Sequence, residues 1–307
     1  METIARGIAY TDLLHMGRAR VIATAVIQSA GGVALVDPGP SSCLETLRAS
    51  LAGAGIAIAD VRALLLTHIH LDHAGATGSL LRENPDITVY VHERGAPHMI
   101  DPSKLLASAE RLYGDRMDEL WGPFLPVPEA NVRILGGGER IEAADRTFEV
   151  AYTPGHAWHH VSFLERASGI AFVGDVAGVR TGRTLFVMPP TPPPDIDVEV
   201  WLESIELVRR WEPATLLVTH FGTHEEPTAH LDAMVEHLTR MKEMARTVIE
   251  AGGDSDEQAA RFGDAMRIYL ERHLPPDEAA AYGAAAPIGM CWLGLARYWR
   301  KRGVGGR

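Results

Sequence analysis

Residues 67–73 read T-H-I-H-L-D-H, so four side chains that can bind metal ions lie within six positions. The preceding residues 61–66 are short and mostly apolar, which is typical of a buried strand. His68 and His70 are two positions apart, so in extended backbone they point to the same side and can share one cation. Asp72 and His73 follow a turn, where residues 74–76 favour the start of a helix and a second cation site. The segment therefore predicts metal binding, since scattered surface histidines would not gather after an apolar strand.

A metal centre needs more ligands, and three candidates stand where strand-like segments end. His156 follows the alternating segment 148–152 and a Pro-Gly turn that would present its imidazole. Asp175 follows the apolar residues 170–173, and His220 follows the apolar residues 214–218. Taken alone, Asp175 is better explained as a turn or cap residue and His220 as a capping or surface histidine. Their order after the first motif favours a shared site.

This ordered set resembles the signature of the metallo-β-lactamase-fold hydrolase superfamily, in which His-x-His-x-Asp-His is followed by a histidine, an aspartate and a histidine. The resemblance extends over about residues 37–220. It implies a first metal held by His68, His70 and His156. It implies a second metal held by Asp72, His73 and His220, with Asp175 bridging the two ions. It also implies that Asp37, which follows an early strand, supports a histidine ligand through a hydrogen bond, and that His160 matches a further histidine of the family pattern.

The ligand types point to hydrolytic chemistry. Imidazole and carboxylate ligands without thiolate suit zinc, iron, manganese or cobalt, and disfavour a closed structural zinc site. We expect two divalent metal ions, zinc first and iron or manganese as alternatives, that hold a bridging hydroxide for attack on a carbonyl carbon. Asp72 and Asp175 are the expected catalytic carboxylates. The chain has no G-x-S-x-G motif, and neither Cys43 nor Cys291 lies in a catalytic motif.

The substrate is open at this stage, because one scaffold hosts many reactions. A lactone or other neutral ester is the first expectation, since no basic cluster for glutathione is evident. A thioester, as in the glyoxalase-II-like branch, and a phosphoester are alternatives within the hydrolases. A mononuclear iron persulfide dioxygenase is an alternative of another class, and a non-catalytic binding protein is disfavoured because no ligand is lost. Residues 157–160 read A-W-H-H where the family often has small residues, so His159 replaces a glycine and has no assigned role.

Composition limits the partners. Lysine and arginine number 29 against 40 acidic residues, which gives a net charge of −11 and argues against nucleic acid as a partner. The two cysteines are far apart in sequence, and the N-terminus lacks the pattern of a signal peptide, so a cytoplasmic location is expected. Residues 21–36 divide into two strands and do not form a membrane span. We expect a small-molecule substrate, and a homodimer is compatible with the methionine and aromatic stripes.

The order of elements predicts an α/β fold, which the resemblance specifies as a metallo-β-lactamase αββα sandwich with a C-terminal helical extension. We expect a catalytic domain over residues 1–225 and helices packed on it over residues 226–307. The helical stripe in 231–249, a capping box at Ser255 and Gln258, and an apolar helix over 288–299 define the extension. Two insertions, 102–128 and the proline-rich 188–197, are expected either to border the substrate pocket or to serve as a surface helix and a connector.

Overall fold

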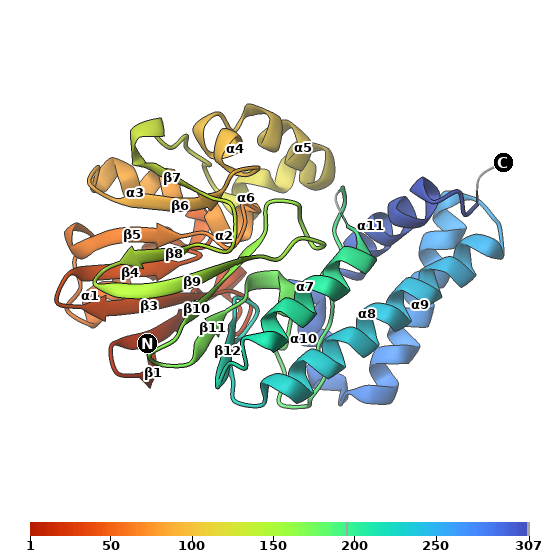
Figure 1. Ribbon diagram of the computed structural model, residues 1–307. Coiled ribbons are helices and arrows are strands. Elements are labelled where there is room, and N and C mark those ends of the chain that lie inside the picture. The colour runs from red at the N-terminus through yellow and green to blue at the C-terminus, as the bar shows by residue number, and fades with distance from the viewer. Residues whose placement is uncertain (195, 306–307) are drawn as a thin grey trace.

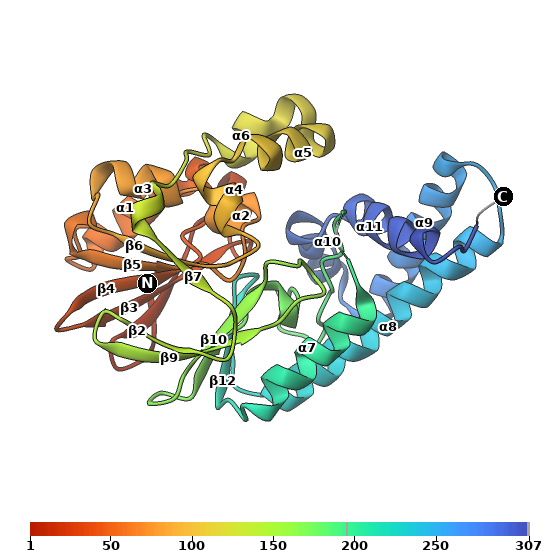
Figure 2. The ribbon, with the colours of Figure 1, turned by 45° about the horizontal axis from the view of Figure 1, so that its top comes forward.

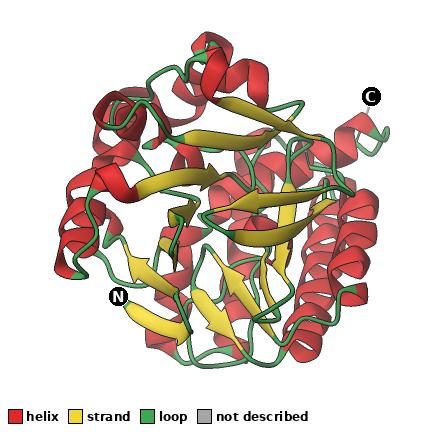
Figure 3. Ribbon diagram, turned by 60° about the vertical axis from the view of Figure 1, so that its left-hand side comes forward, coloured by secondary structure: helices red, strands yellow, loops and turns green. Residues whose placement is uncertain are grey.

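Two β-sheets pack face to face in the computed structural model, which describes residues 1–194 and 196–305, and helices cover the outer faces (Figures 1 and 3). The first sheet has the strand order β1-β2-β3-β4-β5-β6-β7, and the second has the order β13-β12-β11-β10-β9-β8. The predicted αββα sandwich is confirmed. The strands of the first sheet are β1 (Glu2–Ala5), β2 (Ile8–Asp12), β3 (Ala23–Ser29), β4 (Gly32–Val36), β5 (Val61–Leu65), β6 (Thr88–His92) and β7 (Val132–Leu135). Those of the second are β8 (Arg140–Ala143), β9 (Arg146–Tyr152), β10 (Val161–Glu165), β11 (Ile170–Phe172), β12 (Thr215–Val218) and β13 (Gly222–His224).

The space between the sheets is filled by side chains that alternate inward along the strands. Ile27 and Leu65 from the first sheet belong to one buried cluster with Phe148, Phe163 and Phe172 from the second. Because successive strand residues point to opposite faces, the other faces must be covered by helices. On the first sheet the cover includes α1 (Leu44–Gly53) and α3 (Thr77–Glu83), whose Leu47, Leu51 and Leu80 are fully buried.

Strands β4, β5 and β6 run parallel, and β11 runs parallel to β12. Parallel strands bring their carboxyl ends to one edge, so the residues that follow β4, β5, β11 and β12 meet there. The strands predicted before Asp37, His68, His156, Asp175 and His220 are all present within a residue or two of the expected limits.

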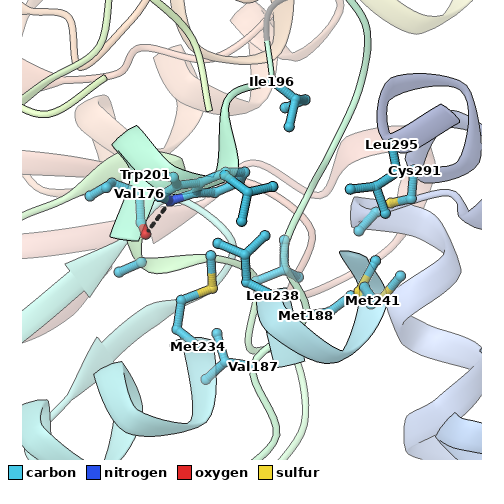
Figure 4. Close-up of a cluster of buried hydrophobic side chains, with 14 of the residues drawn as sticks. Val176, Val187, Met188, Ile196, Trp201, Met234, Leu238, Met241, Cys291 and Leu295 are labelled. Atoms are coloured by element: carbon cyan, nitrogen blue, oxygen red, sulfur yellow. Dashed lines mark hydrogen bonds between the residues drawn. The ribbon is translucent and has the colours of Figure 1, made fainter. Parts of the chain in front are cut away.

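The C-terminal helices continue the cover on the second sheet (Figure 1). They are α7 (Val198–Arg210), α8 (Pro227–Glu250), α9 (Ser255–His273), α10 (Pro276–Ala285) and α11 (Ile288–Lys301). One buried cluster joins Val176, Met188, Trp201, Met234 and Leu295, and Figure 4 shows them together with the hydrogen bond from Trp201 Nε1 to the Val176 carbonyl at 2.8 Å. This cluster contains residues on both sides of position 225, so the division there stays a prediction.

Two details of the extension differ from expectation. The N-cap of α9 is Asp254, which forms a capping box with Glu257, so the prediction of Ser255 and Gln258 is wrong by one residue. The short helix α10 was not expected from the sequence, and Pro276 occupies its first turn, where proline is well tolerated. Within the described part of the chain, no single helix is long and apolar enough to cross a membrane, although α10 and α11 meet that test of length and composition as a bent pair.

The insertion over residues 102–128 forms α5 (Ser103–Tyr113) and α6 (Met117–Trp121). Figure 2 shows both helices standing out from the sandwich on the side where α10 and α11 lie. A cavity lies between the pair α5 and α6 and the pair α10 and α11. Both insertions named from the sequence border it: the first through α5 and α6, and the proline-rich one through residues 190–194.

Candidate metal centre

The predicted ligands come together at the edge where the strands end. His68 and His70 follow β5, Asp72 and His73 lie in the single turn α2 (Leu71–Ala74), and Asp175 lies in a 3₁₀ turn after β11. Three groups of ligand atoms each lie within 4.8 Å of one another. The groups are His68, His70 and His156; His68, His73 and Asp175; and Asp72, His73 and His220. The first and third are the two sets implied by the resemblance, and the second joins them.

Hydrogen bonds on the outer side fix which imidazole nitrogen faces the centre. His156 Nδ1 donates to the Pro190 carbonyl at 2.9 Å, and His220 Nδ1 donates to the Val21 carbonyl. A carbonyl oxygen can only accept, so in each neutral ring the Nε2 lone pair points inward. His68 Nε2 and His156 Nε2 approach His70 Nδ1 at 2.9 and 3.1 Å. Nitrogen atoms at this spacing fit ligands of one shared cation.

Asp175 faces both groups with different oxygens. Its Oδ1 is 3.3 Å from His73 Nε2 and 3.5 Å from His220 Nε2, while its Oδ2 is 3.3 Å from His156 Nε2. Among the described residues, His73 Nε2 and Asp175 Oδ1 are buried and have no hydrogen-bond partner. Buried polar atoms are rarely left unpaired, so these two atoms fit a pair of metal ligands. The donor set present therefore suits divalent metal binding.

Asp37 lies beneath the centre and organises it. Its carboxylate accepts hydrogen bonds from Thr67 N at 2.8 Å, from Thr67 Oγ1 at 2.7 Å and from Thr219 Oγ1 at 2.9 Å. It also accepts from His73 Nδ1 at 2.8 Å. Because the Thr67 hydroxyl proton is used on Asp37, its oxygen accepts from His68 Nδ1 at 3.1 Å. The position is the one expected for a residue that orients histidine ligands.

Burial and neighbouring charges set the protonation of the cluster. Burial lowers the pKa of His70 to about 3 and lowers the pKa of His68 and His156 as well, so these rings are neutral and able to bind metal. Burial is the largest influence on His73 and His220 and opposes charge on them, but the neighbouring carboxylates, Asp175 first and Asp72 with it, together outweigh burial and raise the pKa of both rings.

The carboxylates respond in the opposite direction. Burial alone would raise the pKa of Asp72 and Asp175, yet the nearby histidines, His73 first and His220 with it, together outweigh burial and lower both pKa values. Both carboxylates are therefore ionised, and they provide the negative charge that a divalent cation needs.

His159 and His160 lie beside the ligands without joining the three groups. His160 Nε2 accepts a hydrogen bond from the Asp175 backbone N at 3.2 Å, and its Nδ1 is 2.8 Å from Thr153 Oγ1. This contact positions the loop that carries Asp175. His159 Nδ1 lies 3.4 Å from the Ile69 backbone N, and its ring borders the cavity near His70.

The cavity of about 770 Å³ opens over the cluster. Its floor includes His70, Asp72, His156, Asp175 and His220, and its walls come from α5, α6, residues 190–194 and the α10–α11 segment. The lining also contains Arg18, Lys104 and Arg116. These three residues were missed in the sequence analysis, because Arg18 is far from the other two and Lys104 and Arg116 are 12 positions apart, so they form no basic cluster in the sequence.

An aromatic group closes one side of the cavity. His15 stacks on Trp121 with ring centroids 5.4 Å apart, and Tyr113 meets Trp121 edge-on at 5.1 Å. All three line the cavity. Burial, reinforced by the Asp72 charge, raises the pKa of Tyr113, so its hydroxyl stays protonated over the ligands.

Comparison with known proteins agrees with the fold and the site. The model of the metallo-beta-lactamase superfamily matches residues 17–220. A metallo-beta-lactamase fold-containing protein of Sulfurisphaera tokodaii is 30% identical over 199 residues, which cover 63% of this chain and 72% of that protein. A hydroxyacylglutathione hydrolase of Xanthomonas axonopodis pv. citri is 26% identical over 86% of this chain and 89% of its own length.

Among solved structures, a metallo-beta-lactamase family protein of Thermus thermophilus matches with a TM-score of 0.68, covering 98% of this chain and 95% of that chain at 21% identity. At this identity the likeness establishes the fold, including the helical extension. The chain belongs to the metallo-β-lactamase superfamily. Together with the hydroxyacylglutathione hydrolases among its relatives, this membership identifies it as a metal-dependent hydrolase.

Proposed function

We propose that this protein uses two divalent metal ions to hydrolyse the ester or thioester carbonyl of a small molecule. The observation that carries the proposal is the placement of Asp175, whose two oxygens face two separate groups of ligand atoms, with His156 on one side and His73 and His220 on the other. A carboxylate between two imidazole groups is suited to bridging two ions. Zinc is the first choice for this set of ligands, with iron and manganese as alternatives.

The bound ions would supply an activated water as nucleophile and polarise the carbonyl oxygen. The protein residues hold this arrangement in place. Asp37 and the Pro190 and Val21 carbonyls fix the orientation of His73, His156 and His220. Asp72, 23% exposed, is the ligand carboxylate most open to the cavity, so it is the residue placed to handle a proton during turnover.

The substrate carbonyl has two candidate leaving groups. An oxygen ester, with a lactone as the first expectation, and a thioester both place a carbonyl carbon next to the same ligands. Several relatives, including proteins of Xanthomonas and Haemophilus influenzae, are hydroxyacylglutathione hydrolases, which supports the thioester. A phosphoester remains an alternative, because two metals can also clamp an in-line displacement. Within the described residues both cysteines are free and buried, which supports the proposed cytoplasmic location. The homodimer stays a prediction.

The test is a substrate panel of lactones, linear esters, thioesters and phosphoesters, run with the wild type and with Asp175→Ala at matched total metal. We expect the variant to lose hydrolysis by at least about 100-fold and to bind fewer metal ions. Asp264→Ala, which removes an exposed carboxylate on α9, is the matched control and should keep both properties.

Metal analysis of anaerobically purified protein separates this proposal from the dioxygenase alternative. Two metal ions per chain and hydrolysis without oxygen uptake support the hydrolase. A single iron per chain, together with oxygen uptake on a persulfide, would overturn it.

A further inference from the structure

We propose that the substrate is an amphipathic anion, namely an acyl ester or thioester with an apolar acyl chain of about six or more carbons and a negatively charged leaving group. This inference rests on the proposed function for the identity of the bond that is cleaved. It goes beyond that function because it specifies the two parts of the molecule on either side of the bond. The lining of the cavity carries the argument.

Positive charge is concentrated in the lining of an acidic protein. The chain has a net charge of −11, yet Arg18, Lys104 and Arg116 all line the cavity. Among the described lining residues, the only carboxylates are Asp72 and Asp175, which belong to the metal centre. A bound metal pair would neutralise these two, so the remaining charge that the substrate meets is positive.

Two of the three cations are free to bind a substrate. Within the described residues, no carboxylate lies within ion-pair distance of Arg18 or Lys104. Arg116 pairs with Glu119 at 3.1 Å, but both side chains are more than half exposed, and such pairs exchange readily with solvent. These cations, from the loop after β2 and from the α5–α6 insertion, favour a ligand that carries negative charge, because they raise its local concentration in the cavity.

The walls of the cavity offer apolar surface that no core residue covers. Leu112, Leu120 and Met290 line the cavity and are half buried, and in the described structure they do not belong to the hydrophobic cores beside them. Ala284 and Ala285 also line the cavity on the α10 side, where they pack in part against the neighbouring cores. Small side chains there widen the space, whereas larger ones would fill it. An apolar chain bound in this space would cover surface that is otherwise in contact with water.

The size of the cavity supports an occupant larger than a short hydroxyacyl group. About 770 Å³ lies in the upper part of the range for small-molecule sites, which is roughly 300–1,000 Å³. Both apolar walls belong to segments outside the metal-ligand loops, the α5–α6 insertion and the C-terminal extension. Chain-length preference is therefore set by parts of the protein separate from those that bind metal.

The experiment compares thioesters that differ in one property at a time. Acetyl, hexanoyl and decanoyl groups are attached either to 3-mercaptopropanesulfonate, which is anionic, or to N-acetylcysteamine, which is neutral. We expect kcat/KM to rise with chain length, by up to about fourfold for each methylene that becomes buried. We expect the anionic carrier to be favoured by about tenfold at low ionic strength, and this advantage to shrink in 0.5 M salt because the cations are screened.

Variants then assign the two preferences to their residues. The triple variant Arg18→Gln, Lys104→Gln, Arg116→Gln should lose the preference for the anionic carrier, so that the ratio of kcat/KM on the anionic carrier to kcat/KM on the neutral carrier falls to about one. Arg111→Gln, an exposed cation on α5 outside the lining, is its control. Leu112→Ser should flatten the dependence on chain length, whereas Leu293→Ser, exposed on α11 away from the cavity, should not.

Binding without turnover keeps this inference separate from the proposed function. The S-decyl thioether of 3-mercaptopropanesulfonate has no carbonyl and cannot be hydrolysed, and calorimetry should show that it binds the wild type at least about tenfold more tightly than the triple variant. If no ester or thioester is cleaved but the thioether binds more tightly to the wild type than to the triple variant, the proposed hydrolysis is wrong. The inference that the cavity binds amphipathic anions is then still supported. Hydrolysis with no effect of chain length or carrier charge would overturn the ligand class and leave the proposed function intact.

Discussion

His73 donates a hydrogen bond from Nδ1 to Oδ2 of Asp37 at 2.8 Å, although 36 positions separate the two residues in the chain. The same carboxylate binds Thr67 and Thr219, so one buried group connects the loops after β4, β5 and β12. This bond leaves His73 Nε2 facing Asp175. The geometry of the metal centre therefore depends on a residue that does not itself belong to any ligand group.

We expect Asp37→Asn to weaken metal binding by about 10- to 100-fold, because an amide cannot accept the full set of hydrogen bonds that orients His73. Titration with a competing chelator measures the affinity. Asp12→Asn, which removes a carboxylate that accepts only from the backbone of its own loop, is the control. Equal affinity in the Asp37 variant and the wild type would show that Asp37 does not position the ligands.

Removal of metal is expected to destabilise the folded protein. Ligand atoms that face one another without a cation, such as His73 Nε2 and Asp175 Oδ1, repel or must take up protons. If the metal is present at 1,000 times its dissociation constant, binding contributes about 4 kcal/mol to the free energy of unfolding. Thermal melting before and after chelation, and after zinc is restored, measures this. An unchanged melting temperature would contradict metal binding by the folded state.

Gly155 is expected to tolerate no side chain. Its φ is +124°, and a Cβ atom there would lie 2.3 Å from the Trp201 Cα. We expect Gly155→Ala to lower the free energy of unfolding by about 2–4 kcal/mol and to displace His156. Gly55→Ala is the matched control, because Gly55 also has positive φ, +75°, but has open space around it. Denaturant unfolding and the metal content of both variants test this. If both variants lose the same free energy of unfolding, the positive φ, and not the contact with Trp201, causes the loss.

His230 is expected to make the protein sensitive to acid. Burial lowers its pKa to about 4, and its Nε2 lies 2.7 Å from the Ala177 carbonyl. Because the pKa of His230 is lower in the folded state than the value of about 6.5 in the unfolded chain, the unfolded chain takes up the proton first as the pH falls. The contribution of this ring to the free energy of unfolding is therefore complete above pH 6.5 and is lost as the pH falls towards 4. The loss from this ring between pH 7 and pH 5 is about 2 kcal/mol.

His230→Gln retains a side-chain donor but cannot be protonated, so its stability should fall less between pH 7 and pH 5. Urea unfolding at the two pH values gives the comparison. His273→Gln, which replaces an exposed histidine on α9, serves as the control for a general effect of removing a histidine. If His230→Gln shows the same loss as the wild type, the acid sensitivity arises elsewhere.

The fold and the candidate ligands were largely predictable from the sequence, because both depend on local patterns. Short apolar runs define strands, and the polar residue at the end of each run must lie at the edge of the sheet. The order of His68, His70, Asp72, His73, His156, Asp175 and His220 then indicated one shared centre, and the structure places all seven in three overlapping groups of ligand atoms. The cap of α9 and the helix α10 were less predictable, since single residues at helix ends decide them.

The pocket was decided by tertiary structure alone. Arg18 is far in sequence from Lys104 and Arg116, which led to the expectation of a neutral substrate, and only the tertiary fold brings the loop after β2 and the α5–α6 insertion to the same cavity. The candidate metal ligands lie close in sequence to the strands that place them, so the sequence determines where they lie. The pocket depends on where an insertion and a C-terminal extension meet, and no local pattern encodes that contact.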